Sequence, residues 1–229
     1  LVIIPSRLSA SRLPGKPLLK INGLSIISHV YKKAQEANIG EVFVAAEDQE
    51  IIEDVEKNGG EAILTTNNHK TGTDRIYEAF VKLGRTDIDL IMNLQGDEPL
   101  MNIEDIQKLN KHMIQTKRDL GTLAAKINNK KVFENRDIVK VITEESLDDT
   151  KFPRAINFMR KLNKENNQAY HHLGIYCYNV EILKRFISFK QSQNEIENRL
   201  EQLRALDNNI NVNVALAKSS PIGVDTVSY

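Results

Sequence analysis

Short apolar runs alternate with helix-like stretches along this chain, and this alternation constrains its fold more than any other sequence feature. Runs such as 1–4 and 41–46 have the length of buried strands. The stretch 25–38 instead places Ile26 and Val30 at helical spacing. Strands that alternate with helices in this way are typical of an α/β fold, and we predict that class here.

The predicted elements cover most of the chain. The apolar runs predict strands at 1–4, 41–46, 61–65, 90–94, 121–127, 138–143, 172–178 and 210–217. The helical periods predict helices at 25–38, 74–83, 103–116, 180–189 and 195–206, and one that Asp48 caps and Gly59-Gly60 ends. No linker or repeat divides the sequence, so we predict a single domain over 1–229 with an irregular subregion at about 150–210.

The charge balance argues against partners that need a broad electrostatic field. The chain has 31 Lys and Arg against 31 Asp and Glu, so its formal net charge is zero. Proteins that bind nucleic acid or anionic membranes usually carry a basic face. No apolar run approaches the ~20 residues of a membrane-spanning helix. We therefore expect neither nucleic acid nor a membrane as a partner, and any polyanion must be bound locally.

Cysteine usage and the start of the chain indicate a reducing compartment. The single cysteine, Cys177, lies in the apolar stretch 174–178, which predicts a buried structural thiol. The first residues show no signal-peptide pattern, because the run 1–4 passes directly into Pro5 and an arginine-containing loop. We expect a cytoplasmic protein.

The loop after the first predicted strand carries cations suited to phosphate. In open α/β sheets, ligands bind beyond the carboxyl ends of the strands. The segment 5–17 gathers Arg7, Arg12 and Lys16 among several hydroxyls, and such groups suit a polyphosphate. The segment matches neither the Walker A pattern nor the Gly-x-Gly-x-x-Gly fingerprint. A solvated basic turn is the alternative interpretation.

The loop 95–99 follows the predicted strand 90–94 and carries the adjacent carboxylates Asp97 and Glu98. Mg²⁺ takes one or two protein carboxylates and completes its coordination with water and phosphate oxygens, so Asp97 is a candidate ligand. A turn with exposed acids is the alternative. Together with a phosphate-binding loop, a metal carboxylate would suit phosphoryl-type chemistry.

A third loop, 69–75, follows the predicted strand 61–65 and reads His-Lys-Thr-Gly-Thr-Asp-Arg. Either Thr73 or Asp74 would be a natural N-cap for the helix that begins there. Taken alone, this segment predicts a cap and a polar turn, with ligand binding as the alternative.

Taken in order, these loops resemble the 3-deoxy-manno-octulosonate cytidylyltransferases, the CMP-Kdo synthetases. The similar segments are Ile-Ile-Pro-Ser-Arg (3–7), Ser-Arg-Leu-Pro-Gly-Lys-Pro-Leu (11–18), His-x-x-Gly-Thr-Asp-Arg (69–75), Asn-Leu-Gln-Gly-Asp-Glu-Pro (93–99), His-His-Leu-Gly-Ile-Tyr (171–176), Leu-Glu-Gln-Leu-Arg-Ala-Leu (200–206) and Gly-Val-Asp-Thr (223–226). The first, fourth and last recur across sugar nucleotidyltransferases generally, and the middle-to-late segments are the discriminating set. The resemblance runs nearly from end to end.

The resemblance implies a CTP-dependent transfer in lipopolysaccharide biosynthesis. The anomeric hydroxyl of Kdo would attack the α-phosphate of CTP, pyrophosphate would leave, and CMP-Kdo would form with Mg²⁺ as cofactor. The implied fold is a Rossmann-like nucleotidyltransferase (glycosyltransferase-A-like) fold with a mixed, mostly parallel sheet. The family usually works as a homodimer, which would make the subregion at about 150–210 a sugar-binding and dimerisation region.

The resemblance also assigns roles to individual residues. CTP would be bound by Arg7, Ser11, Arg12, Lys16, Thr71, Gly72, Arg75 and Gln95. Kdo would be bound by Arg154, His172, Tyr176, Glu201 and Gln202. The metal ligands would be Asp97 and Asp225, and the catalytic residues Arg12, Lys16 and Asp97. Without the family, His172 and Tyr176 would be packed strand residues and Glu201 a solvated helix residue.

Two other functions stay open. A cytidylyltransferase for another sugar acid, such as sialic acid, would use the same chemistry, because sugar specificity depends on few contacts. A non-catalytic nucleotide-binding remnant is the second. The chain ends at Tyr229, shortly after the segment 223–226 that leads into a helix in the family, and Pro153 replaces the serine that usually precedes Arg154.

Overall fold

The computed structural model describes residues 1–9, 13–129, 131–162 and 166–218. Its internal contacts group into two compact units, the first formed by Leu1–Gln107 and the second beginning at Lys108. Compact units of this kind occur both within one domain and as separate domains. The single-domain prediction therefore remains a prediction.

Parallel strands form the sheet of the first unit. Their order is β6 (Leu90–Asn93), β1 (Val2–Ser6), β4 (Val42–Ala46) and β5 (Ala62–Leu64). The side chains of β1 and β4 are mostly buried apolar groups, as expected for strands that are covered on both faces. Because all these strands run in one direction, the loops that follow them leave from the same edge of the sheet.

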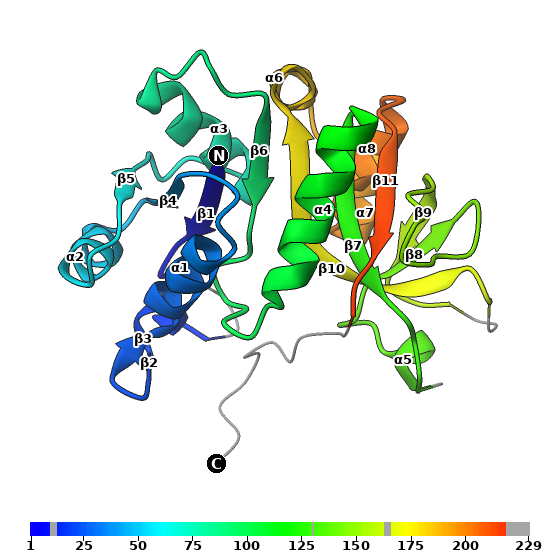
Figure 1. Cartoon of the computed structure of the whole chain (residues 1–229), viewed down its shortest axis with the longest axis horizontal. Helices are drawn as coiled ribbons and strands as arrows, with labels where there is room; N and C mark the ends of the chain where they lie inside the picture. The colour runs from blue at the N-terminus through cyan, green and yellow to red at the C-terminus, as the bar shows by residue number, and fades with distance from the viewer. Residues whose placement is uncertain (10–12, 130, 163–165, 219–229) are drawn as a thin grey trace. The chain divides into compact units, whose positions relative to one another are not determined.

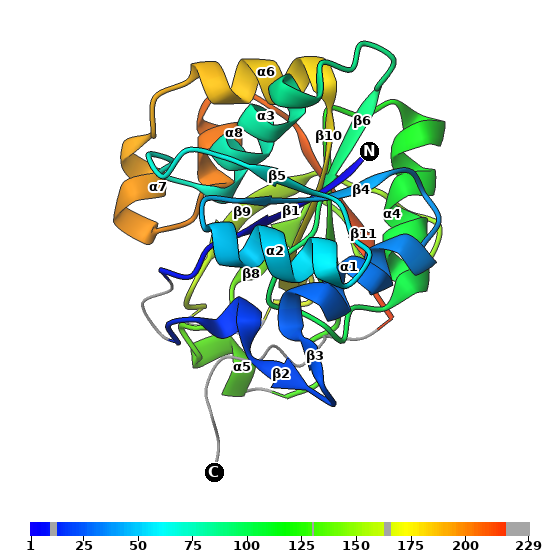
Figure 2. The same ribbon diagram turned by 90° about the vertical axis from the view of Figure 1, so that its left-hand side faces the viewer.

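Helices cover both faces of these strands. They are α1 (Ile26–Glu36), α2 (Gln49–Lys57) and α3 (Gly72–Leu83). In Figure 2, α1 and α2 lie on one side of β1 and β4, and α3 lies on the other. The segment between β1 and α1 contains short elements that the sequence did not predict, namely η1 (Lys16–Leu18), β2 (Lys20–Ile21) and β3 (Leu24–Ser25).

The second unit contains antiparallel as well as parallel strands (Figure 1). Strand β7 (Leu120–Ala125) pairs in parallel with β11 (Val212–Leu216) and antiparallel with β10 (Ala169–Asn179). Strand β10 also pairs antiparallel with β8 (Lys140–Thr143), which pairs antiparallel with β9 (Ala155–Met159). The remaining helices are α4 (Ile103–Thr116), α5 (Lys131–Glu134), α6 (Val180–Ser188), α7 (Gln193–Asn198) and α8 (Leu203–Asp207).

Close packing explains two sequence features of the second unit. A Cβ on Gly121 in β7 would lie 2.7 Å from the sulfur of Met113 and 2.9 Å from Leu109, so glycine lets α4 approach this strand. Cys177 is fully buried in β10, as predicted. Its burial raises the pKa of the thiol to about 12.

The α/β prediction is confirmed, and each predicted strand is present with its ends shifted by a few residues. The prediction of one helix at 195–206 is wrong, because α7 ends at Asn198 and α8 begins at Leu203. Between them, Arg199 adopts a left-handed conformation with φ of 54°, which ends the first helix. None of the helices in the described ranges is long and apolar enough to cross a membrane.

Candidate active site

A cavity of about 300 Å³ lies beyond the carboxyl ends of β1 and β6 in the first unit. Its walls come from the loops after β1, β5 and β6 and from η1. It is lined by Pro5, Ser6, Arg7, Lys16, Pro17, His69, Lys70, Thr71, Gly72, Arg75, Gln95, Gly96 and Asp97. The cavity therefore brings together the three loops that the sequence singled out.

Most of the predicted CTP-binding residues line this cavity. They are Arg7, Lys16, Thr71, Gly72, Arg75 and Gln95, and the predicted metal ligand Asp97 joins them. The other predicted residues of this group, Ser11, Arg12 and Asp225, lie outside the described residues. Their binding roles stay predictions.

A cation and a carboxylate meet at the cavity wall. The Nζ atom of Lys16 lies 2.8 Å from Oδ2 of Asp97. Lys16 is 7% exposed, whereas the Asp97 side chain is 46% exposed. Gly15 precedes η1 with a positive φ of 72°, a conformation that glycine adopts without strain, and it starts the turn that carries Lys16. The paired cation and anion thus lie side by side at the cavity wall.

The loop after β1 is tied to the start of α2. Asp48 occupies the N-cap position of α2, as predicted, but its side chain makes no capping hydrogen bond. Its Oδ2 instead accepts a hydrogen bond of 2.7 Å from the backbone N–H of Leu8. The carboxylate that the sequence assigned to helix capping therefore holds the cation-bearing loop.

At Gly96, the loop after β6 passes close to the end of β1. A Cβ at this position would lie 2.9 Å from the carbonyl oxygen of Pro5, a backbone atom that cannot move aside cheaply. Glycine is therefore required where the loop passes the strand. The contact keeps the segment that carries Asp97 close to the segment that carries Arg7.

A capping box fixes the N-terminus of α3. The Asp74 N–H donates to Thr71 Oγ1 at 3.3 Å, and the Thr71 N–H donates to Asp74 Oδ2 at 3.1 Å. The N-cap is therefore Thr71, and the prediction of Thr73 or Asp74 as the cap is wrong; Thr73 is buried inside the helix. The helix N-terminus with Thr71 and Gly72 forms part of the cavity wall, where its partial positive charge favours an anion.

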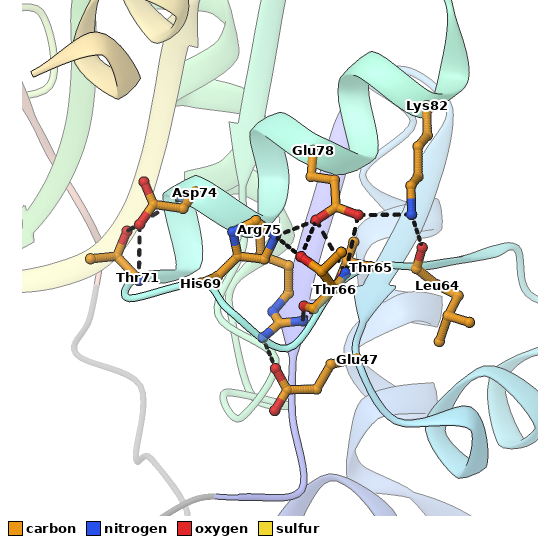
Figure 3. A network of polar contacts seen from close by, with 10 residues as sticks. All are labelled: Glu47, Leu64, Thr65, Thr66, His69, Thr71, Asp74, Arg75, Glu78 and Lys82. Carbon is orange, nitrogen blue, oxygen red and sulfur yellow. Dashed lines mark hydrogen bonds and ion pairs between the residues drawn. The ribbon is translucent and has the colours of Figure 1, made fainter.

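Arg75 lines the cavity, but its guanidinium also has protein partners (Figure 3). Its Nη1 donates to Thr65 Oγ1 at 2.6 Å and to the Thr66 carbonyl at 3.3 Å. Its Nη2 forms an ion pair with Glu47. Arg75 is 3% exposed, so a large part of its role is to hold the loop after β5.

Several cavity residues received no role from the sequence. Ser6, His69 and Lys70 line the cavity alongside the predicted set. Each lies inside a segment that was singled out, so position next to a predicted residue was the available signal. Ser6 Oγ is buried, and no hydrogen-bond partner for it is found among the described residues.

The second unit groups most of the predicted sugar-acid residues. The rings of His172 and Tyr176 lie 5.4 Å apart, and both residues are buried. Burial raises the pKa of Tyr176, and the charges of Tyr178 and Glu201 raise it further, which places Glu201 near this ring. Gln202 is 7% exposed and follows Glu201 in the turn between α7 and α8.

His172 is a neutral side chain. Its Nε2 lies 3.0 Å from Thr122 Oγ1 on β7, and the Phe158 ring packs edge-on against it with centroids 5.0 Å apart. Burial, with a smaller contribution from the neighbouring His171, lowers the pKa of His172 to about 3. The imidazole can therefore exchange hydrogen bonds with hydroxyls, but it carries no charge at neutral pH.

Arg154 is not grouped with His172 and Tyr176, neither of which lines the cavity to which Arg154 belongs. Arg154 lines a separate cavity of about 350 Å³ in the second unit, together with residues such as Arg118 and Lys151. Its Nη2 lies 2.6 Å from Glu144 Oε1. The prediction that Arg154 binds the sugar acid stays a prediction.

The metal prediction depends on one described carboxylate. In the described part of the chain, no group of three or more His, Cys, Asp and Glu side chains is arranged to hold a metal. Asp97 alone, half exposed at the cavity wall, suits an ion that takes one or two carboxylates and fills its remaining positions with water and phosphate oxygens. The donor chemistry therefore fits Mg²⁺.

The parallel strands of the first unit, with a cation-lined cavity at their carboxyl ends, are typical of a Rossmann-like α/β fold, and the comparisons identify the class as nucleotidyltransferases of this fold. The family model for cytidylyltransferases matches residues 1–213. A solved structure of CMP:2-keto-3-deoxy-manno-octonic acid synthetase complexed with CTP is similar, with a TM-score of 0.88 and 34% identity over 99% of this chain and 92% of that chain.

Relatives of known name identify the family within this class of nucleotidyltransferases. The chain is 41% identical over 228 residues to the 3-deoxy-manno-octulosonate cytidylyltransferase of Afipia carboxidovorans, covering 99% of this chain and 92% of the relative. It is 43% identical over 235 residues to the enzyme of that name from Thermodesulfovibrio yellowstonii, covering 98% and 92%. The chain belongs to the family of 3-deoxy-manno-octulosonate cytidylyltransferases.

Proposed function

We propose that this protein transfers CMP from CTP to Kdo and releases pyrophosphate, supplying CMP-Kdo for lipopolysaccharide biosynthesis. The observation that supports this most is the cavity at the ends of β1 and β6, which gathers Arg7, Lys16, Lys70 and Asp97. Cations beside a carboxylate suit a triphosphate with its metal. Relatives that carry the name 3-deoxy-manno-octulosonate cytidylyltransferase match nearly the whole chain.

The proposed reaction needs positioning and charge neutralisation rather than a covalent protein intermediate. The sugar hydroxyl displaces pyrophosphate in line at the α-phosphate of CTP. Lys16 and Arg7 hold the phosphates and neutralise the charge that develops on the leaving pyrophosphate. The N-terminus of α3, with Thr71 and Gly72, adds a partial positive charge on the opposite loop. Arg12, outside the described residues, belongs to the same cation set.

The cofactor in this proposal is Mg²⁺, held by Asp97 and, outside the described residues, by Asp225. When bound, the ion supplies charge neutralisation and polarisation of the triphosphate. Asp97 holds its negative charge at the cavity wall, and Lys16, 2.8 Å away, orients that carboxylate.

The sugar acid is proposed to be bound by residues of the second unit. Neutral His172 forms hydrogen bonds with the sugar hydroxyls, because an uncharged imidazole cannot form an ion pair with the Kdo carboxylate. Arg154 keeps its charge, and its guanidinium is the partner for that carboxylate once Glu144 is displaced. Tyr176, Glu201 and Gln202 complete the set. A cytoplasmic homodimer is part of the proposal and follows from the family resemblance.

Pyrophosphate release tests this function directly. The protein is incubated with CTP, Mg²⁺ and Kdo, and the assay is repeated with sialic acid in place of Kdo and with UTP or ATP in place of CTP. We expect turnover with CTP and Kdo, and loss of turnover when a chelator removes the metal. Turnover with sialic acid alone would contradict the proposal. Tight CTP binding without turnover would instead favour a nucleotide-binding remnant.

A further inference from the structure

One wall of the candidate CTP cavity is a loop without regular structure. Residues 69–72 line the cavity, and the loop 65–71 to which most of them belong forms neither strand nor helix. Such a loop lacks the hydrogen-bond ladder of a strand or helix, so other contacts must fix it before it can present a defined surface to a ligand. Figure 3 shows the side chains that make these contacts.

Glu78 on α3 binds this loop at two places. Its Oε1 accepts a hydrogen bond of 3.0 Å from the Thr66 N–H, and its Oε2 accepts one of 2.8 Å from the Thr66 hydroxyl. The same Oε2 accepts a hydrogen bond from Nε2 of His69, one of the residues that line the cavity. Thr66 and His69 thus converge on a single carboxylate (Figure 3).

The Glu78 carboxylate is charged and well supported. Its side chain is 18% exposed, and the Lys82 Nζ, one helical turn later, lies 2.7 Å from Oε1. Burial opposes ionisation, but hydrogen bonds from Lys82, Thr66 and His69 together lower the pKa of Glu78 to about 2. The group therefore stays ionised at neutral pH, and hydrogen bonds to an ionised acceptor are stronger than those to a neutral one.

The other anchors of the loop act at its ends. Arg75 binds Thr65 and Thr66 at the start, and the capping box between Thr71 and Asp74 fixes the end. His69 lies between these points, and Glu78 is the residue of α3 that holds it.

We propose that Glu78 is a positioning residue for nucleotide binding, because it holds His69 and Thr66 and thereby fixes the cavity wall that carries His69, Lys70 and Thr71. This proposal rests on the assignment of the cavity to CTP. Glu78 does not itself line the cavity, so its effect is transmitted through His69 and the loop backbone. Preorganisation of this wall lowers the ordering that CTP must impose when it binds.

The test replaces Glu78 by glutamine, which keeps the shape of the side chain and removes its charge. We expect the KM for CTP to rise about tenfold, while kcat and the KM for Kdo change by less than about twofold. The melting temperature should fall by no more than about 4 °C. A role limited to fold stability would lower the melting temperature without a selective change in the KM for CTP.

A double-mutant cycle shows whether Glu78 acts through His69. The variants are Glu78→Gln, His69→Ala and the combination of the two. We expect the combination to raise the KM for CTP by less than the product of the two single effects, because His69→Ala already removes one of the two loop contacts of Glu78 and leaves only the contact with Thr66. If Glu78→Gln fails to fold, His69→Ala must still raise the KM for CTP, since it leaves the contacts of Glu78 with Thr66 and Lys82 in place.

Glu181→Gln is the matched control. Like Glu78, Glu181 lies on a helix and forms an ion pair with a lysine one turn later, in this case Lys184 at 2.7 Å. Unlike Glu78, its side chain is largely exposed, and it lines neither of the two cavities described above. The KM for CTP of the Glu181→Gln variant should equal that of the wild type. An unchanged KM for CTP in Glu78→Gln, or effects of Glu78 and His69 that multiply in full, would overturn the proposal.

Calorimetric titration with CTP and Mg²⁺, without Kdo, separates this proposal from the proposed function. The dissociation constant of CTP should rise about tenfold in Glu78→Gln, as the KM does. A wild-type protein that binds CTP without turning over Kdo would refute the transferase function and still decide the role of Glu78. A protein that turns over Kdo normally in both forms, with equal CTP affinity, would refute only the role of Glu78.

Discussion

Lys16 and Asp97 illustrate how single residues set the chemistry of the cavity. Their side chains lie 2.8 Å apart, although 81 positions separate them in the sequence. Each follows a parallel strand, and parallel strands deliver their following loops to one edge. A triphosphate with its metal would find an anion and a cation already in place, so little side-chain rearrangement is needed on binding.

Asp97→Asn is the residue-scale prediction. We expect the substitution to abolish turnover, because an amide cannot supply the charge that a hard cation requires. We expect only a modest loss of stability, because the Asp97 side chain is 46% exposed, although its partner Lys16 is 7% exposed. Pyrophosphate release and thermal unfolding measure the two effects. An Asp97→Asn protein with near-normal turnover would remove this residue from the metal site.

The sequence predicted which residues gather at the cavity where a charged side chain and a position beyond a strand coincide; their binding roles stay predictions. Arg7, Lys16 and Asp97 could be selected because each combines a charged group with a place just beyond a strand. The contacts that Arg75 and Asp48 make within the protein could not be predicted from the sequence. Their partners, Glu47 and Leu8, become neighbours only when the sheet has formed. Arg154 likewise lies in a cavity that its own segment does not predict.

At the scale of elements, the turn between α7 and α8 shows why one helix was predicted where two are found. Leu200, Leu203 and Leu206 have helical spacing, and the periodicity continues across the break. The left-handed conformation of Arg199 leaves no mark on that periodicity. Predictions of strands fared better, because a buried parallel strand appears in the sequence as a compact apolar run.

A buried ion pair joins these two helices. Arg204 on α8 donates from Nε to Glu195 Oε2 at 2.8 Å and from Nη2 to Oε1 at 2.6 Å. Both residues are almost fully buried, and the guanidinium lies 4.6 Å from the centroid of the Phe186 ring on α6. The pair brackets the turn that carries Glu201 and Gln202, so it also fixes two residues of the proposed sugar-acid set.

Arg204→Met is the element-scale prediction. We expect the free energy of unfolding to fall by about 3–5 kcal/mol, because the variant leaves the Glu195 carboxylate buried without its cation. Urea unfolding measures this change. The double variant Arg204→Met with Glu195→Gln should recover part of the loss, since it removes the buried charge as well. A loss below about 1 kcal/mol in Arg204→Met would show that the pair is not a significant source of stability.

At the scale of the whole molecule, a net charge of zero is a matter of distribution. The described charges that are proposed to act on the triphosphate and its metal gather around one cavity, whereas ion pairs such as Lys184–Glu181 and Arg85–Asp87 lie on the surface. The balance of charged residues in the sequence argues against a broad basic face. Only the fold shows that Arg7, Lys16 and Lys70 line one cavity.

Thiol labelling gives the whole-molecule prediction. The single cysteine, Cys177, is buried in the second unit, and its pKa of about 12 leaves only about one thiol in ten thousand ionised at pH 8. A disulfide reagent should therefore label the native protein at least about a thousandfold more slowly than the protein in urea. The rate under mild denaturant then reports the opening of this unit. Equally fast labelling in both conditions would contradict the buried position, and Cys177→Ser provides the blank.

Efforts to redirect such an enzyme to another nucleotide would begin by randomising the residues around the cavity. Position 96 has to be left out of any such library, because a side chain there would collide with the Pro5 carbonyl 2.9 Å away. Since backbone meets backbone at this crossing, changes in the segments on either side of it cannot be selected independently. Library designers would do better to vary the β1 and β6 loops jointly, as one cassette built around an invariant glycine.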